Sequence, residues 1–174
     1  MIQLSDELEQ QIRAHAVQDF PYECCGVMLG WVEGDTKTVH ALKAIQNEHS
    51  DGHERRYLIS PDEMFRLDRE ARAGGHKILG FYHSHPNHPA RPSTYDRDWA
   101  WPWYSYIIVS SVSGGTEQMT SWCLNDDNEA FTAERIEPWE GARIADYEAV
   151  MASLAEDDIA RCLPLPDSNV VPSN

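Results

Sequence analysis

The sequence feature that most constrains the fold is the stretch from Lys77 to Asp96, in which an apolar run ends in His83-Ser84-His85. A short apolar run bounded by turn residues is typical of a buried strand. Side chains alternate between the two faces of a strand, so His83 and His85 point the same way and Ser84 points the other way. Two imidazoles on one face can bind one ion, so this stretch predicts half of a metal site.

A stiff connection follows this strand and leads to the start of a helix. Residues 86–92 contain three prolines, which fix local backbone angles and cannot continue a sheet. Ser93-x-x-Asp96 then has the pattern of a capping box, in which Ser93 caps the helix and Asp96 lies in its first turn. A carboxylate held in this way could be a third ligand, leaving the fourth position of a tetrahedral zinc ion open for water.

Two other arrangements of histidines are alternatives to consider. His88, three residues after His85, could replace Asp96 as a ligand, although the neighbouring prolines disfavour the helical geometry that this spacing needs. His49 and His53 have the i, i+4 spacing of a helical metal site, but residues 50–52 between them disfavour a helix. The sequence therefore favours the centre at His83 and His85.

A glutamate far upstream completes a larger pattern. Glu23 stands in Pro-Tyr-Glu-Cys-Cys-Gly, immediately before an apolar run over 25–32 that predicts another buried strand. A lone glutamate before a strand is usually a solvated side chain. Combined with His83-x-His85 and Ser93-x-x-Asp96, however, Glu23 gives a set of residues that resembles the signature of the JAMM (MPN-plus) zinc metalloproteases.

The resemblance implies a fold and a mechanism. The fold is a cytidine-deaminase-like JAMM/MPN catalytic core over residues 1–137, and the cofactor is one Zn²⁺ ion with a bound water. In that family two histidines and an aspartate bind zinc, a glutamate acts as general base, and a serine stabilises the oxyanion. Carried over to this chain, the metal ligands are His83, His85 and Asp96, and the catalytic residues are Glu23 and Ser93.

The resemblance also implies a substrate. The chain looks most like prokaryotic members that process ubiquitin-like sulfur-carrier proteins, which predicts a zinc peptidase or isopeptidase that cleaves after a carrier's C-terminal Gly-Gly, for example to release cysteine. By resemblance alone, an insertion would contact the substrate through Arg55, Arg56 and Tyr57. The alternative is a non-catalytic MPN-type interaction scaffold, against which the intact set of motif residues counts. A zinc deaminase of bases is disfavoured because its His-x-Glu and Pro-Cys-x-x-Cys signatures do not occur.

Apolar periodicity and turn residues predict the elements around these motifs. In order, they are a helix over 6–19, strands over 25–32 and 38–45, a helix from Pro61 to Gly74-Gly75, a strand over 78–85, a helix at Asp96, a strand over 104–109 and a hairpin of 119–124 with 130–136. This order predicts an α/β fold with a mixed β-sheet flanked by helices. Residues 138–162 are expected to form a helical extension that packs on the domain or in a homodimer, and 163–174 a disordered tail.

Cysteines and tryptophans have simpler interpretations. The adjacent Cys24 and Cys25 cannot easily bridge each other, and we interpret them as reduced, buried, small apolar side chains. Trp99, Trp101 and Trp103 could line a peptide groove, but aromatic residues at this density are more often part of a core. We therefore expect the three tryptophans to be buried.

Composition limits the partners. There are 29 acidic and 14 basic residues, a formal charge of −15, whereas binding to a nucleic-acid backbone depends on Lys and Arg. A neutral or basic protein tail is a better partner, although the acidity could instead serve solubility or a salty habitat. The N-terminus has no signal-peptide pattern, and no stretch reaches the roughly 18 apolar residues of a membrane span. A cytoplasmic protein without membrane or nucleic-acid partners is predicted.

Overall fold

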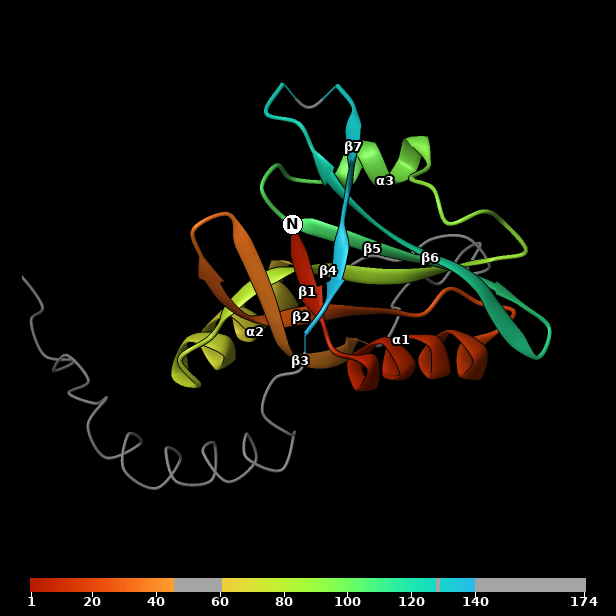
Figure 1. The fold of residues 1–174 in the computed structure, drawn as a ribbon, viewed down its shortest axis with the longest axis horizontal. Coiled ribbons are helices and arrows are strands. Elements are labelled where there is room, and N and C mark those ends of the chain that lie inside the picture. The colour runs from red at the N-terminus through yellow and green to blue at the C-terminus, as the bar shows by residue number, and fades with distance from the viewer. Residues whose placement is uncertain (46–60, 128, 140–174) are drawn as a thin grey trace, which may run out of the picture. The chain divides into compact units, whose positions relative to one another are not determined.

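The fold is built on one large mixed sheet, shown in the computed structural model in Figure 1. The structure describes residues 1–45, 61–127 and 129–139. Eight strands are hydrogen-bonded in the order β7-β6-β5-β4-β2-β3-β1-β8. They are β1 (Ile2–Leu4), β2 (Cys25–Glu33), β3 (Thr36–Ile45), β4 (Lys77–Pro86), β5 (Ser105–Val112), β6 (Gly115–Leu124), β7 (Phe131–Glu134) and β8 (Ile136–Pro138). The helices are α1 (Asp6–Asp19), α2 (Pro61–Ala73) and α3 (Thr94–Trp99). The mixed α/β fold predicted from the sequence is confirmed.

The domain prediction can be compared with only part of the chain. The chain divides into a unit of residues 1–141 and a unit of residues 142–174, and the fold concerns the first. Apart from Pro138 and Trp139, the predicted extension over 138–162 and the predicted tail over 163–174 lie outside the described residues. The boundary near residue 137 stays a prediction.

Strand β4 lies in the middle of the sheet, antiparallel to β2 and parallel to β5. Nine of its ten residues are buried, which fits its nearly continuous apolar sequence. Cys25 of β2 pairs with His83, and the antiparallel register continues outward as the Ser84 N–H donates to the Cys24 carbonyl at 3.1 Å. One more step along this register brings Glu23 opposite His85.

Helices α1 and α2 have the bounds that the sequence predicts. The Ser5 side chain caps α1 by accepting from the Leu8 N–H at 3.3 Å, and the helix buries an apolar face of Leu8, Ile12 and Ala16. Helix α2 begins at Pro61, as expected. Gly75 follows α2 with φ of +72°, a conformation that favours glycine after a helix.

A buried core lies between α2 and the strands that lead to the histidines. Leu67 and Ala71 of α2 belong to one buried cluster with Phe81 of β4 and Tyr106 of β5. This cluster supports the strand just before the histidines. On the opposite face, Tyr82 lies against Gly26, where an added Cβ would come within 2.4 Å of the tyrosine ring. Gly26 is therefore needed for this close packing of β2 on β4.

The two outermost strands of the sheet are consecutive in the chain. Only Arg135 separates β7, which pairs with β6, from β8, which pairs in parallel with β1. The Ile2 N–H donates to the Arg135 carbonyl at 3.1 Å, so the sheet curls until its two edges meet at this residue. Figure 1 shows the chain running from β7 into β8 beside β1. Closure of this kind leaves few exposed strand edges.

The predicted hairpin is therefore only partly right. Residues 121–124 and 131–134 do form an antiparallel pair, as expected. Residue 136, however, which we expected in the same strand, begins β8 at the opposite edge. Strand β1 was not predicted, because its three residues are too few to show a periodic pattern.

The prediction that the three tryptophans are buried is wrong. Trp99, Trp101 and Trp103 are 63%, 55% and 49% exposed. The aromatic core beneath them is already filled by other rings, since the Phe81 centroid lies 5.4 Å from Tyr104 and 5.7 Å from that of Tyr106. Helix α3 ends at Trp99. The segment after α3 therefore runs over an aromatic core that has no room for it.

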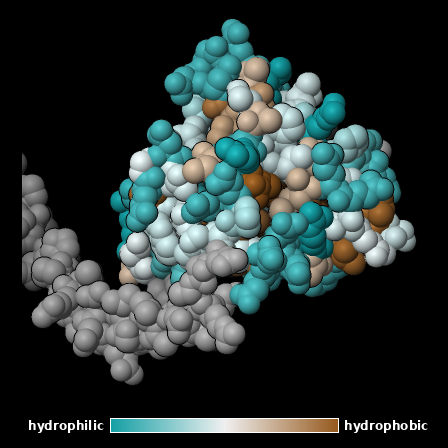
Figure 2. Space-filling model, viewed as in Figure 1, coloured by the Kyte–Doolittle hydropathy of each residue, from teal (hydrophilic) through white to brown (hydrophobic). Residues whose placement is uncertain are grey.

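Hydrophilic residues dominate the face shown in Figure 2, with apolar residues scattered between them. This agrees with the strong excess of acidic residues in the sequence. Among the described residues, none of the helices is both long enough and apolar enough to cross a membrane.

Candidate metal centre

The end of β4 brings the two predicted histidine ligands onto one face. His83 is completely buried and His85 is 8% exposed, and their Nε2 atoms lie 3.0 Å apart. Ser84 points to the opposite face, where its Oγ accepts a hydrogen bond from the Cys24 N–H at 2.9 Å. The alternation predicted from the sequence therefore exists, and Ser84 ties β4 to the start of β2.

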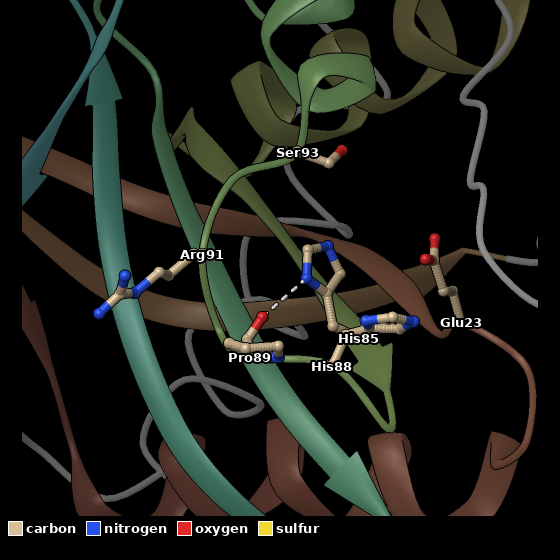
Figure 3. A pocket seen from close by; sticks show the side chains of 6 residues that line it. All are labelled: Glu23, His85, His88, Pro89, Arg91 and Ser93. Atoms are coloured by element: carbon tan, nitrogen blue, oxygen red, sulfur yellow. Dashed lines mark hydrogen bonds between the residues drawn. The ribbon is translucent and has the colours of Figure 1, made fainter.

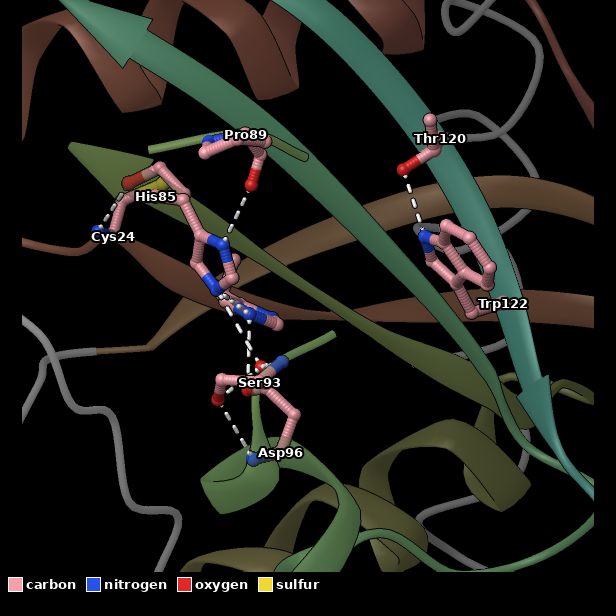
Figure 4. A network of polar contacts seen from close by, with 9 residues as sticks. Cys24, His85, Pro89, Ser93, Asp96, Thr120 and Trp122 are labelled. Carbon is pink, nitrogen blue, oxygen red and sulfur yellow. Dashed lines mark hydrogen bonds and ion pairs between the residues drawn. The ribbon is translucent and has the colours of Figure 1, made fainter. Parts of the chain in front are cut away.

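Asp96 joins the two histidines from the first turn of α3. Its Oδ1 lies 3.2 Å from His83 Nε2, and its Oδ2 lies 3.5 Å from His85 Nε2. Tetrahedral zinc with bonds of about 2.0–2.2 Å would place its ligand atoms about 3.3 Å apart. The separation of the two imidazole nitrogens and the separation of each nitrogen from its nearer Asp96 oxygen are close to this value, and one ligand atom from each residue lies within 4.8 Å of the others, so the group could hold a metal ion of that size. Figure 4 shows His85 at the strand end and Asp96 at the start of the helix pointing towards each other.

Groups behind the three side chains hold them in place. His85 Nδ1 lies 3.0 Å from the Pro89 carbonyl oxygen, an outer partner typical of metal-binding histidines. The loop that carries Pro89 is in turn held by the Thr120 hydroxyl, which donates to the Ala90 carbonyl at 2.6 Å. The sequence did not predict these contacts, because a backbone acceptor leaves no signal in residue types.

The predicted capping box supports Asp96. The Ser93 Oγ accepts from the Asp96 N–H at 3.1 Å, and the Ser93 N–H donates to Asp96 Oδ2 at 2.6 Å. The Ser93 hydroxyl also donates to the same carboxylate oxygen at 2.7 Å. These contacts fix the direction of the carboxylate. Ser93-x-x-Asp96 can therefore act as a capping box and supply a metal ligand at the same time.

Burial and charge set the protonation of the group. Burial lowers the pKa of His83, and it also opposes protonation of His85, but the Asp96 carboxylate raises the pKa of His85 overall. Burial would raise the pKa of Asp96, yet the two histidines hold it well below its usual range. Asp96 is therefore an anion, which is the form in which a carboxylate binds a metal.

Glu23 lines the same pocket as this centre. The pocket has a volume of about 290 Å³ and is lined by Glu23, His85, His88, Pro89, Arg91 and Ser93. Figure 3 shows Glu23 across the pocket from Ser93, with the His85 ring between their backbones. Glu23 is only 6% exposed although it carries an ionisable group. Its position follows from the β2–β4 register, which places it opposite His85.

The structure brings together some candidate residues and leaves others apart. Among the described residues, the one group of three or more His, Cys, Asp or Glu with ligand atoms within 4.8 Å of one another is His83, His85 and Asp96. The alternative ligand His88 lines the pocket but does not belong to this group. Arg55, Arg56 and Tyr57, together with His49 and His53, lie outside the described residues.

The adjacent cysteines are not part of the reactive group. Cys24 and Cys25 are 0% and 1% exposed, which confirms the prediction of small buried side chains. Burial raises the pKa of each thiol to about 12. A thiol with such a pKa is not a nucleophile at neutral pH.

The fold and the site define a class of protein, namely a mixed-sheet α/β domain with a buried His-His-Asp group that could bind a metal ion. Residues 5–125 match the model of a family described as prokaryotic homologs of the JAB domain. The match covers more than half of the chain, so the chain belongs to this family of JAB/MPN domains, as the motifs predicted.

Individual relatives agree with this assignment. A desampylase of Haloferax volcanii is 35% identical over 106 residues, which are 60% of this chain and 74% of the relative. A solution structure of a protein from Desulfitobacterium hafniense has a TM-score of 0.71 at 30% identity, covering 83% of this chain and 97% of that one. Another, from Salinibacter ruber, has a TM-score of 0.63 at 38% identity, with coverages of 80% and 92%. The likeness therefore extends beyond the motif to most of the described fold.

Proposed function

We propose that this protein is a zinc-dependent peptidase or isopeptidase that cleaves after the C-terminal Gly-Gly of a ubiquitin-like or sulfur-carrier protein. The observation that carries the proposal is the convergence of His83, His85 and Asp96 at the edge of a pocket that His85 and Glu23 both line. The relative named desampylase supports a hydrolase of the JAB family that cleaves conjugates of ubiquitin-like proteins. That the metal is zinc, and that the cleaved bond follows Gly-Gly, are proposed in addition to this activity.

The metal would be held by three protein groups. His83 and His85 offer Nε2 atoms and Asp96 offers a carboxylate oxygen, a set of ligands that suits zinc and leaves one position open. Zinc bound there would lower the pKa of a water molecule and polarise the carbonyl of the scissile bond. The hydrogen bonds to His85 and Asp96 from behind keep both ligands oriented.

Glu23 is proposed as the general base and acid. Its carboxylate lines the pocket beside His85, where it can accept the proton of the attacking water and pass it to the leaving amine. An almost fully buried glutamate interacts with fewer solvent molecules, which favours proton transfer with the substrate. Glu23 would therefore act in both halves of the reaction without binding the metal.

Ser93 is proposed to stabilise the tetrahedral oxyanion. Its hydroxyl lies at the same pocket and donates to Asp96 Oδ2 in the absence of substrate. To donate to the substrate, the hydroxyl must turn from Asp96 towards the developing negative charge. A positioned donor of this kind is needed only in the transition state.

Several parts of the proposal rest on the sequence. Arg55, Arg56 and Tyr57 are proposed to contact the carrier. The carrier is the expected macromolecular partner, and a homodimer through residues 138–162 and a cytoplasmic location are further expectations. Cysteine is one proposed leaving group.

The central experiment is the substitution Glu23→Gln, with Glu129→Gln as a control on the exposed β6–β7 turn. Zinc content is measured on the purified proteins, and turnover is followed with a carrier extended by cysteine after Gly-Gly. We expect Glu23→Gln to keep one zinc ion and to lose turnover, because the amide cannot accept the proton. Glu129→Gln should match the parent in both.

Three results would contradict different parts of the proposal. Normal turnover by Glu23→Gln would remove the mechanism. If the parent binds zinc but releases no cysteine, the leaving group is wrong while the enzyme class stands. A parent that binds no zinc and cleaves no conjugate would instead favour an interaction scaffold.

A further inference from the structure

A second cavity adjoins the reaction pocket. It has a volume of about 380 Å³ and is lined by Asn87, His88, Pro89, Ser110, Val112, Glu117 and Gln118. His88 and Pro89 line both cavities, so the two lie on either side of the turn that follows β4. We refer to the second as the Glu117 cavity. A substrate group bound in it would lie next to the scissile bond.

The walls of the Glu117 cavity come from rigid elements. Ser110 is in β5 and is 3% exposed, and Glu117 and Gln118 are in the neighbouring strand β6. Asn87 forms the turn, with φ of +56°, and its N–H donates to the Ser111 carbonyl at 2.7 Å. Asparagine tolerates this left-handed conformation better than most residues. The cavity is therefore formed before any substrate binds.

Glu117 gives the cavity its charge. Its Oε2 accepts a hydrogen bond from the Ser110 hydroxyl at 3.5 Å, a long and weak contact. Within residues 1–45, 61–127 and 129–139, no Lys, Arg or His forms an ion pair with this carboxylate. The amide oxygens of Asn87 and Gln118 add further acceptors. The cavity therefore offers acceptors and the negative charge of the exposed Glu117, with His88 on the wall that it shares with the first pocket.

We propose that the Glu117 cavity binds a positively charged side chain, lysine or arginine, of the molecule that leaves when the carrier is released. The inference rests on the proposed function, because it assumes cleavage after Gly-Gly. The two carrier residues nearest to that bond have no side chains. Because carrier side chains begin only before this Gly-Gly pair, whereas the leaving molecule can carry a side chain directly after the bond, we assign the cavity to the leaving side.

Size and charge both suit such an occupant. Ligand pockets of about 300–1,000 Å³ can bury molecules larger than one amino-acid side chain, so the cavity has room for a lysine or an arginine. The ammonium or guanidinium group would reach the Glu117 carboxylate and the amide oxygens. An acidic side chain would instead be repelled. The substrates favoured are thus conjugates to a basic stretch of a protein or peptide.

The test uses one ubiquitin-like carrier ending in Gly-Gly, extended by Ser-Lys-Ser, Ser-Gln-Ser or Ser-Glu-Ser. We expect the parent to prefer the lysine conjugate over the glutamate conjugate by about twofold to fivefold in kcat/KM, which is typical of an accessible ion pair. Glu117→Gln should bring this ratio close to one, and Glu117→Lys should reverse it. Glu129→Gln, a matched change outside the cavity, should keep the parent's ratio.

Binding provides a readout that does not depend on turnover. The Kd of each conjugate is measured by calorimetry on Glu23→Gln and on Glu23→Gln combined with Glu117→Lys. A preference for lysine that the added lysine at position 117 reverses would support the cavity even if no conjugate is cleaved, a result that removes the proposed function. Equal Kd and kcat/KM values for the three conjugates, or ratios unchanged in Glu117→Lys, would overturn the inference.

Discussion

Two pairs of histidines in this protein meet in different ways. His83 and His85 bring their Nε2 atoms within 3.0 Å of each other beside the Asp96 carboxylate. His40 and His76 instead stack face to face, with ring centroids 5.3 Å apart and an angle of 11° between the planes. Both pairs come from strands or their ends, so residue type alone does not distinguish them.

The surroundings of the two pairs explain the difference. Trp31 lies 5.1 Å from the His40 ring and 6.2 Å from the His76 ring, between centroids, and Trp139 lies 5.7 Å from Trp31. When two imidazole rings stack face to face, their nitrogens point away from each other and cannot bind the same ion. When the rings approach through their nitrogens, both nitrogens can bind one ion. A histidine pair becomes a candidate metal centre when its nitrogens converge on a carboxylate, and part of an aromatic cluster when its faces meet.

The strongest way to break this comparison is to remove one ring from each pair. We expect His85→Ala to lose its zinc and more than about 100-fold of its turnover, because a ligand matters more than its outer partners. His76→Ala should keep one zinc ion and the parent's turnover. Metal analysis and kcat/KM on both proteins check this. Zinc retained in His85→Ala would contradict the assignment of the centre.

Removing the metal should separate the two pairs through stability. With free zinc at about 1,000 times its Kd, the bound ion adds about 4 kcal/mol to the free energy of unfolding of the parent. A chelator should remove this amount from the parent and from His40→Phe, and nothing from Asp96→Ala. Urea unfolding with and without the chelator measures the differences. Equal effects on all three proteins would mean that zinc binds elsewhere.

A smaller effect is expected from the serine behind Asp96. Ser93→Ala removes the N-cap of α3 and should cost about 1 kcal/mol of stability. It should also lower kcat by about 100-fold if the hydroxyl stabilises the oxyanion. Ser93→Gly is the matched variant, since glycine at an N-cap costs only a few tenths of a kcal/mol. If Ser93→Gly keeps the parent's kcat, the hydroxyl has no catalytic role.

The smallest expected effect is a loss of stability at low pH caused by the stacked His40 and His76. Burial lowers the pKa of both His40 and His76 from their ordinary value of 6.5, so the folded protein favours the neutral rings. Below that pH the unfolded chain takes up protons first, and stability should fall until the folded-state pKa values are passed. Urea midpoints of metal-free protein between about pH 7.5 and pH 5 should therefore fall less in His40→Phe than in the parent. If the urea midpoints of the parent and of His40→Phe fall by the same amount, the stacked histidines do not contribute to the loss of stability in acid.

The local parts of the site could be predicted from the sequence. His83-x-His85 depends on strand alternation and Ser93-x-x-Asp96 on helix capping, and both rules act within a few residues. Glu23 is different, because nothing local marks it as functional. Only the β2–β4 register, which joins residues about sixty positions apart, brings it to the pocket. A resemblance to a family could find it where periodicity could not.

The errors have a common physical cause, which is competition for places in the tertiary structure. The tryptophans after Asp96 are apolar enough for a core, but Phe81, Tyr104 and Tyr106 occupy the space beneath them. Strands β1 and β8 are too short for their sequences to specify an edge, and they are fixed by pairing with each other. Such outcomes depend on the whole set of packed elements rather than on any one segment.

The closure of the sheet has a consequence for how the protein folds. Ile2 pairs with Ile136, so the parallel β1–β8 contact joins segments from opposite ends of the unit of residues 1–141. Bringing such distant segments together carries a large loop-closure entropy, and topologies rich in distant pairs fold slowly, in milliseconds to seconds. The adjacent β2–β3 and β5–β6 hairpins can form early from neighbouring residues. The ring of strands is thus expected to close last, after the segment that bears the histidines has joined its neighbours.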